Sequence, residues 1–408
     1  MLVLVLNCGS SSVKFQLIRT SPEEIEAGTE KKLARGNIEK IGMTTAIVSF
    51  QAEGRPSVKE NPVILEHRVA IERVLELLSD PTVGIIKDSS EIGAVGHRVV
   101  HGGEKFSKSQ VITDEVYRRI VECCELAPLH NPHNVRGYEI ARELLPDVPH
   151  VAVFDTAFHQ TIPEYAYLYG LPMIFYRRHG IRRYGFHGTS HRYLTYRMQQ
   201  LLGRPQSEFN LITCHLGNGC SIAAVLRGHS IDTSMGFTPL EGLLMGTRSG
   251  DLDPAIILHI MAKEELTLHE ANTLLNKHSG LIGISGVSND MRELVKEAQN
   301  GSKGAQTAIE MFCYRLKKYI SAYHGVLGGA DAVAFTGGIG ENSPLVRELS
   351  CKGLECLGII VDRERNEKLN GSEGRISTDD SRVGVYVVPT DEEIVIARDT
   401  ANAIAGKL

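Results

Sequence analysis

Two glycine-rich turns, each set between two apolar runs, carry residue types that bind phosphate. The first turn spans residues 7–12 and the second spans residues 215–219. Glycine lets backbone N–H groups approach an anion, serine hydroxyls donate hydrogen bonds, and lysine supplies a point charge. A hairpin without a ligand is the alternative for either turn alone, and their repetition favours phosphate binding. The candidates are Asn7, Ser10, Ser12, Lys14, His215, Leu216, Gly217, Asn218 and Gly219.

Two arginines, an aspartate and a histidine stand where a phosphoryl transfer would use them. Arg98 ends an apolar run, Asp155 follows another run at 151–154, and Arg248 lies in a long Gly-, Thr- and Ser-rich segment. Ligands bind at the carboxyl ends of parallel strands, and arginines neutralise a transferring phosphoryl group. Asp155 is a candidate for Mg²⁺ or substrate organisation, with helix capping as the alternative. His187, beside Gly188, can approach a reacting phosphoryl group closely.

Histidine pairs with metal-like spacing do not predict zinc in this chain. His130 and His133 lie among prolines, and His187 and His191 lack the intervening Glu of a zinc helix. A rigid loop over 127–134 is expected, and His130 is a candidate donor to the substrate. Glu392 either caps the final helix or serves as a metal-side carboxylate.

A third glycine turn joins a buried strand, 331–336, to a helix that is expected from about Pro344. Glycines at such a junction let a nucleotide lie against the backbone. The residues concerned are Gly337, Gly338, Ile339, Gly340, Glu341 and Asn342.

Composition indicates a globular chain of two domains. The 408 residues are 42% hydrophobic, and the net charge of −5 gives no footprint for nucleic acid. No apolar run approaches the ~18 residues of a membrane span, and the amino terminus begins as a strand, so a cytoplasmic protein without a membrane or nucleic-acid partner is expected. The eight cysteines show no CxxC pair and are expected to be reduced.

The two hairpins begin the two halves of the chain, so an internal duplication is expected. Apolar periodicity predicts helices over 69–78, 113–125, 192–202, 254–263, 267–276, 290–299 and 305–323, with a final helix after Pro389. The predicted architecture is α/β, with two phosphate-holding turns on opposite sides of a cleft.

Ten motifs distributed along the whole chain, in order, resemble the acetokinase family: LNCGSSSVKFQL, GHRVVHGG, APLHNPHN, FDTAFH, RYGFHGTSH, HLGNGCS, MGFTPLEGLLMGTRSGDLDP, SNDMRE, FTGGIGENSP and PTDEEIVIARDT. The resemblance implies the duplicated actin/Hsp70/sugar-kinase fold, which is ribonuclease H-like, in a homodimer. It divides the chain into an N-terminal domain, 1–152 plus 388–408, and a nucleotide-binding domain, 153–387. The implied reaction is reversible, Mg²⁺–ATP-dependent phosphorylation of acetate to acetyl phosphate; Mn²⁺ could replace Mg²⁺.

The same resemblance assigns roles to individual positions. It implies that Asn7 and Glu392 lie on the metal side, that Lys14, Ser10 and Ser12 face phosphate, and that Arg98 holds the substrate. Asp155 would be the catalytic acid, and His187 and Arg248 would stabilise the transition state. The nucleotide would be lined by His215 to Gly219, Asp290, Met291, Arg292 and Gly338 to Asn342. Val100, Leu129, His130, Phe186 and Pro239 would surround acetate.

Two alternatives stay open from the sequence. Propionate or butyrate could replace acetate, because one methylene changes discrimination by only ~1–3 kcal/mol. A nucleotide-gated scaffold protein is the alternative of another class, and the second set of anion-binding residues, Arg98, His187 and Arg248, argues against it.

Overall fold

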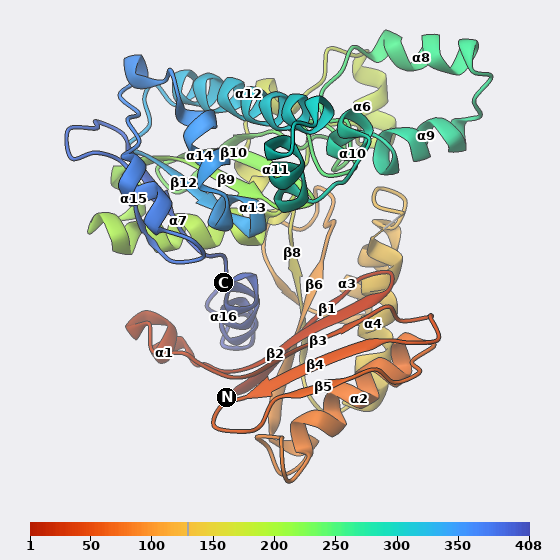
Figure 1. Cartoon of the computed structure of the whole chain (residues 1–408). Coiled ribbons are helices and arrows are strands. Elements are labelled where there is room, and N and C mark those ends of the chain that lie inside the picture. Colours follow the sequence, from red (N-terminus) through yellow and green to blue (C-terminus); the bar gives the residue numbers. More distant parts are fainter. Residues whose placement is uncertain (129) are drawn as a thin grey trace. The chain divides into compact units, whose positions relative to one another are not determined.

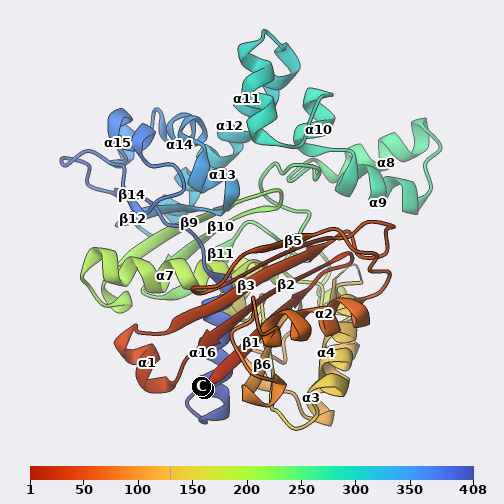
Figure 2. The same cartoon turned by 60° about the horizontal axis from the view of Figure 1, so that its bottom comes forward.

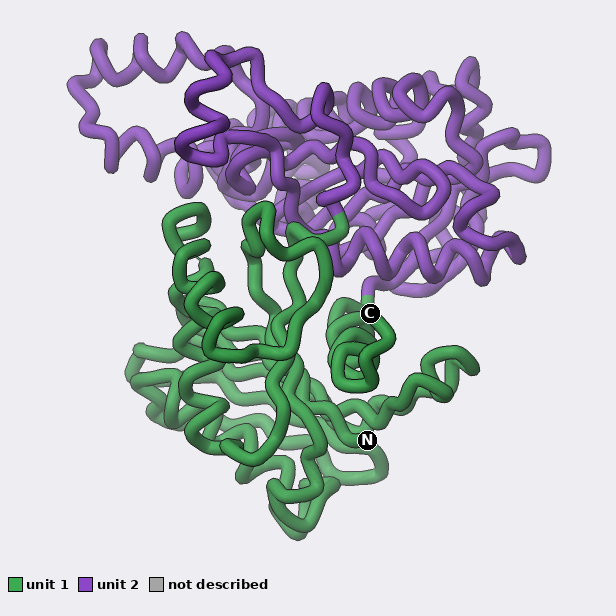
Figure 3. The backbone as a smooth tube through the Cα atoms, turned by 180° about the vertical axis from the view of Figure 1, so that it is seen from behind, with its two compact units in different colours: residues 1–158, 391–408 green, residues 159–390 purple. Residues whose placement is uncertain are grey.

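The computed structural model describes residues 1–128 and 130–408 (Figure 1). The chain forms two compact units (Figure 3): unit 1 comprises Met1–Phe158 and Asp391–Leu408, and unit 2 comprises His159–Thr390. The domain boundaries expected from the sequence, 152/153 and 387/388, stay a prediction of where the functional domains divide.

Unit 1 is built on an eight-stranded sheet of order β5-β4-β3-β2-β1-β6-β8-β7. Figure 2 shows β1, β2 and β3 of this sheet side by side. Its strands are β1 (Leu2–Cys8), β2 (Ser12–Arg19), β3 (Lys31–Glu39), β4 (Ile47–Ala52), β5 (Val58–Glu60), β6 (Ile92–Val99), β7 (Gln110–Val111) and β8 (His150–Phe154). Its helices are α1 (Pro22–Ala27), α2 (His67–Ser79), α3 (Asp114–Glu122), α4 (Asn131–Leu144) and α16 (Glu392–Ile404).

Unit 2 contains a six-stranded sheet of order β11-β10-β9-β12-β14-β13. Its strands are β9 (Asn210–Leu216), β10 (Cys220–Leu226), β11 (His229–Thr233), β12 (Ala332–Thr336), β13 (Gly374–Arg375) and β14 (Gly384–Val387). Its helices are α5 (Glu164–Tyr167), α6 (Met173–His179), α7 (Gly188–Leu202), α8 (Pro254–Lys263), α9 (Leu268–Lys277), α10 (Gly280–Ser285), α11 (Met291–Gln299), α12 (Lys303–Val326), α13 (Gly337–Asn342), α14 (Pro344–Cys351) and α15 (Arg363–Lys368).

Five strands in each unit share one topology. The order β3-β2-β1-β6-β8 in unit 1 corresponds to β11-β10-β9-β12-β14 in unit 2. In both, the first three strands pair antiparallel and the last three pair parallel. Both predicted hairpins, β1–β2 and β9–β10, are the first pair of their repeat. The predicted internal duplication is therefore confirmed.

Alternation along β1 gives the unit 1 sheet two packed faces. Leu4 and Leu6 belong to the core on the α2 and α4 side, whereas Val3 and Val5 pack with Ile396 of α16 on the other face. A strand that is buried on both faces reads as a continuous apolar run, and β1 was predicted on this basis. The carboxyl ends of β1, β6 and β8 consequently meet at one edge of the sheet, since these strands are parallel.

In unit 2, α12 and α7 lie on opposite faces of the sheet (Figure 1). The helix predicted over 305–323 lies within α12, and its apolar stripe is buried: Ala308, Ile309, Phe312, Leu316 and Ile320. Odd-numbered residues of β9 point toward α7, where Thr213 hydrogen bonds with His191. The unit 2 sheet therefore places polar strand residues next to a helix that begins near a candidate site.

Two predicted non-helical segments are helical. Residues 337–342, predicted as a turn, form α13 despite three glycines, and side-chain hydrogen bonds support its backbone. The Glu341 carboxylate accepts from the Gly337 amide at 2.9 Å, and the guanidinium of Arg347 donates to the carbonyls of Gly340 and Glu341 at 2.8 and 3.0 Å. The loop predicted over 127–134 gives way to α4 at Asn131, because Pro132 suits a helix's first turn.

None of the eight cysteines forms a disulfide, as expected. Among residues 1–128 and 130–408, no helix combines the length and apolarity that crossing a bilayer requires. The cytoplasmic location stays a prediction.

Candidate active site

The first glycine turn sits at the end of β1 in unit 1. The Gly9 amide donates to the Ser12 carbonyl at 2.8 Å, which closes the turn. Asn7 and Lys14 are paired in the β1–β2 ladder, so both side chains project from the same face. Ser10 and Lys14 are exposed. The turn thus presents an amide, hydroxyls and an ammonium group beside the edge where the parallel strands end.

Arg98 and Asp155 form an ion pair at this edge. The Arg98 guanidinium donates from Nε and Nη2 to the Asp155 carboxylate, with a shortest separation of 2.5 Å. Its Nη1 lies 3.4 Å from Asn7 Oδ1, and its Nε lies 3.9 Å from a carboxylate oxygen of Glu392. Three strands and the first residue of α16 thereby gather four of the predicted residues.

The ion pair dominates the electrostatics of this cluster. Burial alone would lower the pKa of Arg98, but the carboxylates of Asp155 and Glu392 outweigh it and raise that pKa above its usual value. Asp155 is only 1% exposed and Arg98 is 20% exposed. Burial and the neighbouring Glu392 raise the pKa of Glu393. The cluster is therefore ionic, partly shielded from solvent and rich in oxygen atoms.

The second glycine turn, in unit 2, brings His187 and Arg248 together. A Cβ atom placed on Gly219 would lie 3.4 Å from Arg248 Nη1 and 3.7 Å from His187 Nε2. His187 precedes α7 with φ of 56°, in the left-handed region that costs a non-glycine residue of the order of 1 kcal/mol. Its ring stacks on His215, with centroids 4.2 Å apart. The His187 imidazole, held by a strained backbone, and the Arg248 guanidinium therefore lie close together beside Gly219.

Arg248 contacts no carboxylate among the described residues. Its Nη1 donates to the Pro239 carbonyl at 3.2 Å and lies 3.7 Å from Met245 Sδ. Burial lowers its pKa, as expected for a cation whose charge has no counterion. Such a group binds an anion favourably, because part of the desolvation of the cation has already been paid in the folded protein.

A network that sequence analysis missed holds the loop carrying Arg248. Arg183 pairs with Glu241 at 2.6 Å and donates to the carbonyls of residues 233–235. Further along, Asp251 accepts from the Gly242 amide at 2.8 Å and from the Tyr319 hydroxyl at 2.6 Å. These anchors make a segment without helix or strand rigid. Only the position of Arg183 next to Tyr184 in RYGFHGTSH hinted at this role.

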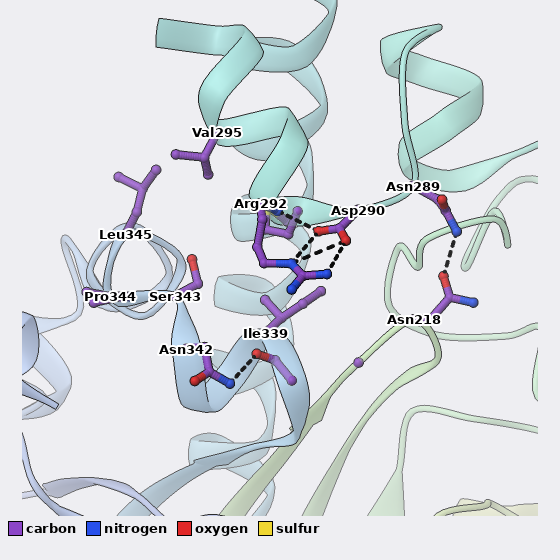
Figure 4. A pocket seen from close by; sticks show the side chains of 13 residues that line it. Asn218, Asn289, Asp290, Arg292, Val295, Ile339, Asn342, Ser343, Pro344 and Leu345 are labelled. Carbon is purple, nitrogen blue, oxygen red and sulfur yellow. Dashed lines mark hydrogen bonds and ion pairs between the residues drawn. The ribbon is translucent and has the colours of Figure 1, made fainter. Parts of the chain in front are cut away.

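A cavity of about 690 Å³ lies in unit 2 between the second turn, α11 and α13 (Figure 4). Eight of its lining residues were predicted to contact the nucleotide: Gly217, Asn218, Asp290, Met291, Arg292, Gly338, Ile339 and Asn342. Sequence analysis missed the other five: Asn289, Val295, Ser343, Pro344 and Leu345. Val295, Pro344 and Leu345 add apolar surface, which suits the face of a purine base.

Hydrogen bonds and an ion pair among the lining residues hold the walls of this cavity in place. Arg292 pairs with Asp290 at 2.6 Å at the start of α11. Asn342 donates to the Gly338 carbonyl at 3.0 Å, and Asn289 donates to Asn218 Oδ1 at 3.2 Å (Figure 4). The predicted residues His215, Leu216, Gly219, Gly340 and Glu341 do not line the cavity. Glu341 instead accepts from the amides of Gly337 and Thr390.

The residues predicted to surround the substrate are divided between the units. Val100 is buried in unit 1, where its amide donates to Asn134 Oδ1, and His130 precedes α4. Phe186 is buried in unit 2, and the Pro239 carbonyl accepts from Arg248. Leu129 lies outside the described residues. The predicted methyl pocket stays a prediction.

The folded units and these clusters define a class: an enzyme of the duplicated actin-like fold that transfers a phosphoryl group from a nucleotide. The sequence pattern of the acetokinase family matches residues 2–398. The chain therefore belongs to the acetokinase family.

Individual relatives agree with this assignment. The chain is 53% identical to an acetate kinase of Caldanaerobacter subterraneus subsp. tengcongensis and 54% identical to one of Symbiobacterium thermophilum, each over all of both chains. The crystal structure of Porphyromonas gingivalis acetate kinase superposes with a TM-score of 0.92 at 47% identity, covering 99% of both chains. The crystal structure of a propionate kinase from Francisella tularensis superposes with a TM-score of 0.90 at 42% sequence identity, and the match covers 98% of this chain and 99% of the other. The predicted fold class is confirmed.

Proposed function

We propose that this enzyme catalyses the reversible transfer of the γ-phosphoryl group of ATP to acetate, giving acetyl phosphate and ADP. The observation that carries the proposal is the partly buried Arg248, which has no carboxylate partner among the described residues and lies beside His187 at a glycine turn. A spread negative charge, such as that of a phosphoryl group in transfer, would complete this site. The names of the full-length relatives support acetate as the acceptor.

The cavity of unit 2 is proposed to hold the nucleotide. Its apolar residues would contact the base, and the amides of the second turn would approach the phosphates. The proximity of Gly217 and Asn218 to both cavity and turn supports this orientation. His187 and Arg248 would then face the γ-phosphate and stabilise the charge that develops on its oxygens.

Asn7, Asp155 and Glu392 are proposed to serve Mg²⁺. Hard oxygen ligands suit this ion, which keeps several waters and binds through one or two carboxylates together with phosphate. Among residues 1–128 and 130–408, no group of three or more His, Cys, Asp or Glu side chains could hold a metal ion. When bound, Mg²⁺ would neutralise phosphate charge and orient the leaving group; Mn²⁺ has the same ligand preference.

Acetate is proposed to attack as its carboxylate. A carboxylic acid with a pKa of about 4 in water is ionised at pH 7, so the reaction needs no general base. Arg98 would hold one carboxylate oxygen, while Asp155 keeps the guanidinium in place through two hydrogen bonds. Positioning and charge neutralisation would then supply most of the acceleration.

A homodimer is proposed from an apolar surface of unit 2. None of the ten residues of α8 is buried, although most are apolar. Leu258 is 71% exposed, and Leu268 at the start of α9 is 80% exposed. Apolar side chains gathered in this way are typical of an interface. Sedimentation equilibrium is expected to give twice the mass of the chain, and Leu258→Asp to give a monomer; a monomeric parent would reject the dimer.

The test of the activity is ADP formation by purified protein with Mg²⁺–ATP and acetate, propionate or butyrate, with acyl phosphate trapped by hydroxylamine. Acetate-dependent ADP with an equal amount of hydroxamate is the expected result. Propionate is the second candidate, because one similar structure is a propionate kinase. A higher kcat/KM for propionate would replace acetate, and ATP hydrolysis indifferent to all three acids would reject phosphoryl transfer to them.

A further inference from the structure

Behind His187, three buried side chains form one hydrogen-bonded line that the reaction described above does not use. His187 Nδ1 lies 2.8 Å from Ser221 Oγ, and Ser221 Oγ lies 2.8 Å from His191 Nε2. His191 Nδ1 lies 2.7 Å from Thr213 Oγ1. Ser221, His191 and Thr213 are each 0% exposed. We call these three residues the directing chain.

The fold explains why the three residues meet. Thr213 lies on β9 and Ser221 on β10, on the face that α7 covers, and His191 is in the first turn of α7. The His191 amide donates to the His187 carbonyl at 3.0 Å, which fixes the separation of the two imidazoles. The geometry therefore depends on the hairpin and the helix rather than on a mobile loop.

The number of protons determines the direction of the hydrogen bonds. Burial lowers the pKa of His191 well below its usual value, with smaller contributions from His159 and His215, so its ring carries one proton. Each of the three hydrogen bonds, His187–Ser221, Ser221–His191 and His191–Thr213, must contain one proton. If Thr213 donates to His191 Nδ1, then His191 donates from Nε2 to Ser221, and Ser221 donates to His187 Nδ1. Every buried donor then has an acceptor.

The opposite direction leaves a donor without an acceptor. If His187 Nδ1 donated to Ser221, Ser221 would donate to His191 Nε2, and His191 Nδ1 would donate to Thr213. The Thr213 hydroxyl has no second partner among the described residues, so its own proton would be buried without an acceptor. Such a group costs about 1–3 kcal/mol. The first arrangement is thus favoured about fivefold or more.

We propose that the directing chain holds His187 as the neutral tautomer with its proton on Nε2, so that this N–H donates to the transferring phosphoryl group beside Arg248. Nε2 is the nitrogen that lies 3.7 Å from the position of a Gly219 Cβ, which Arg248 Nη1 also approaches. A neutral donor avoids placing a second cation next to Arg248. The role of His187 rests on the proposed function, whereas its tautomer does not. Ser221, His191 and Thr213 are positioning residues, and no bond in the chain is made or broken.

Side-chain ¹⁵N NMR of histidine-labelled, full-length protein tests the tautomer without turnover. The His187 signals are assigned by their loss in His187→Gln. At pH 7, His187 is expected to be protonated at Nε2 alone. In Thr213→Val, which keeps the side-chain shape but removes the first donor, the Nδ1–H form should become populated. Thr195→Val is the matched control, because Thr195 is buried in α7 and donates only to the His191 carbonyl.

A wild-type His187 that carries its proton on Nδ1, or on both nitrogens, would overturn the proposal, as would an unchanged tautomer in Thr213→Val. Kinetics supply the second readout. Ser221→Ala should lower kcat about tenfold with KM for acetate and ATP within twofold, and should have no further effect in a His187→Gln background. A full additional loss in the double variant would show a merely structural role. If the wild-type enzyme makes no acyl phosphate, the proposed function fails while the NMR result still decides the tautomer.

Discussion

Arg98 in unit 1 and Arg248 in unit 2 are both partly buried, yet their surroundings are opposite. Arg98 is bound to Asp155 by three short contacts and has Glu392 nearby, so its charge is compensated and its pKa is raised. Arg248 is bound only to a carbonyl and a thioether among the described residues, and burial lowers its pKa. Arg98 therefore holds carboxylates in place, whereas Arg248 has a charge that a bound anion can neutralise.

The neighbouring groups repeat this contrast. Around Arg98 lie the carboxylates of Asp155 and Glu392, whereas the Arg248 guanidinium contacts the Pro239 carbonyl and lies near the His187 imidazole. A neutral surrounding preserves the attraction of Arg248 for phosphate, because no carboxylate among the described residues competes for it. Five substitutions test this comparison.

Removing the uncompensated cation should have the largest effect. Arg248→Ala is expected to lower kcat by about 10³-fold with little change in the KM for acetate, since arginines that neutralise a transferring phosphoryl group contribute this much. Arg248→Lys should recover part of the loss. Steady-state assays of both variants measure this. A variant in which only KM rises would mean that Arg248 binds the ground state and not the transition state.

Asp155→Asn changes the compensated cluster without changing its shape. The amide cannot balance Arg98 or bind Mg²⁺ as an anion, so kcat is expected to fall about 10²-fold and the Mg²⁺ concentration for half-maximal rate to rise. Titration of the activity with Mg²⁺ measures both. Near-normal turnover with unchanged Mg²⁺ dependence would remove Asp155 from catalysis and metal binding alike.

Acid should lower the stability of the folded protein, because it protonates the buried, neutral His159 of unit 2. Burial lowers the pKa of His159 to about 4, below the usual 6.5. The unfolded chain binds a proton on His159 more tightly than the folded chain does. The contribution of neutral His159 to the free energy of unfolding is therefore complete above pH 6.5 and is lost as the pH falls toward 4. The loss at pH 5 is about 2 kcal/mol. Urea unfolding at pH 7 and pH 5 should show this difference in the parent and a smaller one in His159→Gln.

The control for this measurement is His269→Gln, because His269 lies on the exposed surface of α9 in the same unit. That variant should lose as much stability as the parent between pH 7 and pH 5. Equal acid sensitivity of the parent and His159→Gln would show that the neutral state of His159 contributes nothing.

The features of the fold and site that the sequence predicts are those whose interacting residues are close together in the chain. The hairpins and the α12 stripe follow local patterns, and sequence analysis predicted them. The resemblance named the members of both arginine clusters. It did not predict that Arg98 would bind Asp155, 57 residues away, because this requires β6 and β8 to be adjacent.

The missed features share a physical cause. The directing chain joins α7, β9 and β10, and no periodicity relates Thr213, Ser221 and His191. The glycines of α13 disfavour a helix locally, whereas hydrogen bonds of the Glu341 carboxylate and the Arg347 guanidinium to its backbone support one. Ser343 to Leu345 line the cavity because α14 follows α13 directly. In each case the residues meet through an arrangement in space that no periodic pattern of the sequence indicates.

Arg98→Lys tests whether the compensated arginine also binds the acceptor. Lysine keeps the positive charge beside Asp155, so the buried carboxylate retains a partner, but the planar fork that serves two carboxylates at once is lost. The KM for acetate is expected to rise about tenfold while kcat changes less than about threefold. A purely catalytic loss with normal KM would assign Arg98 to the transition state and weaken the contrast with Arg248.

The smallest effect is expected at the exposed end of the unit 2 cavity that is proposed to hold the nucleotide. Arg292 is 87% exposed and pairs with Asp290, so its attraction for phosphate is screened by solvent and shared with a carboxylate. Arg292→Ala should raise the KM for ATP only about threefold and leave the KM for acetate unchanged. The matched control is Arg363→Ala, which removes an arginine that is 77% exposed and paired with Glu367, away from the cavity lining. Equal effects of the two would mean that Arg292 acts through net charge alone; a hundredfold effect would make it a third anion-binding arginine, comparable with Arg248.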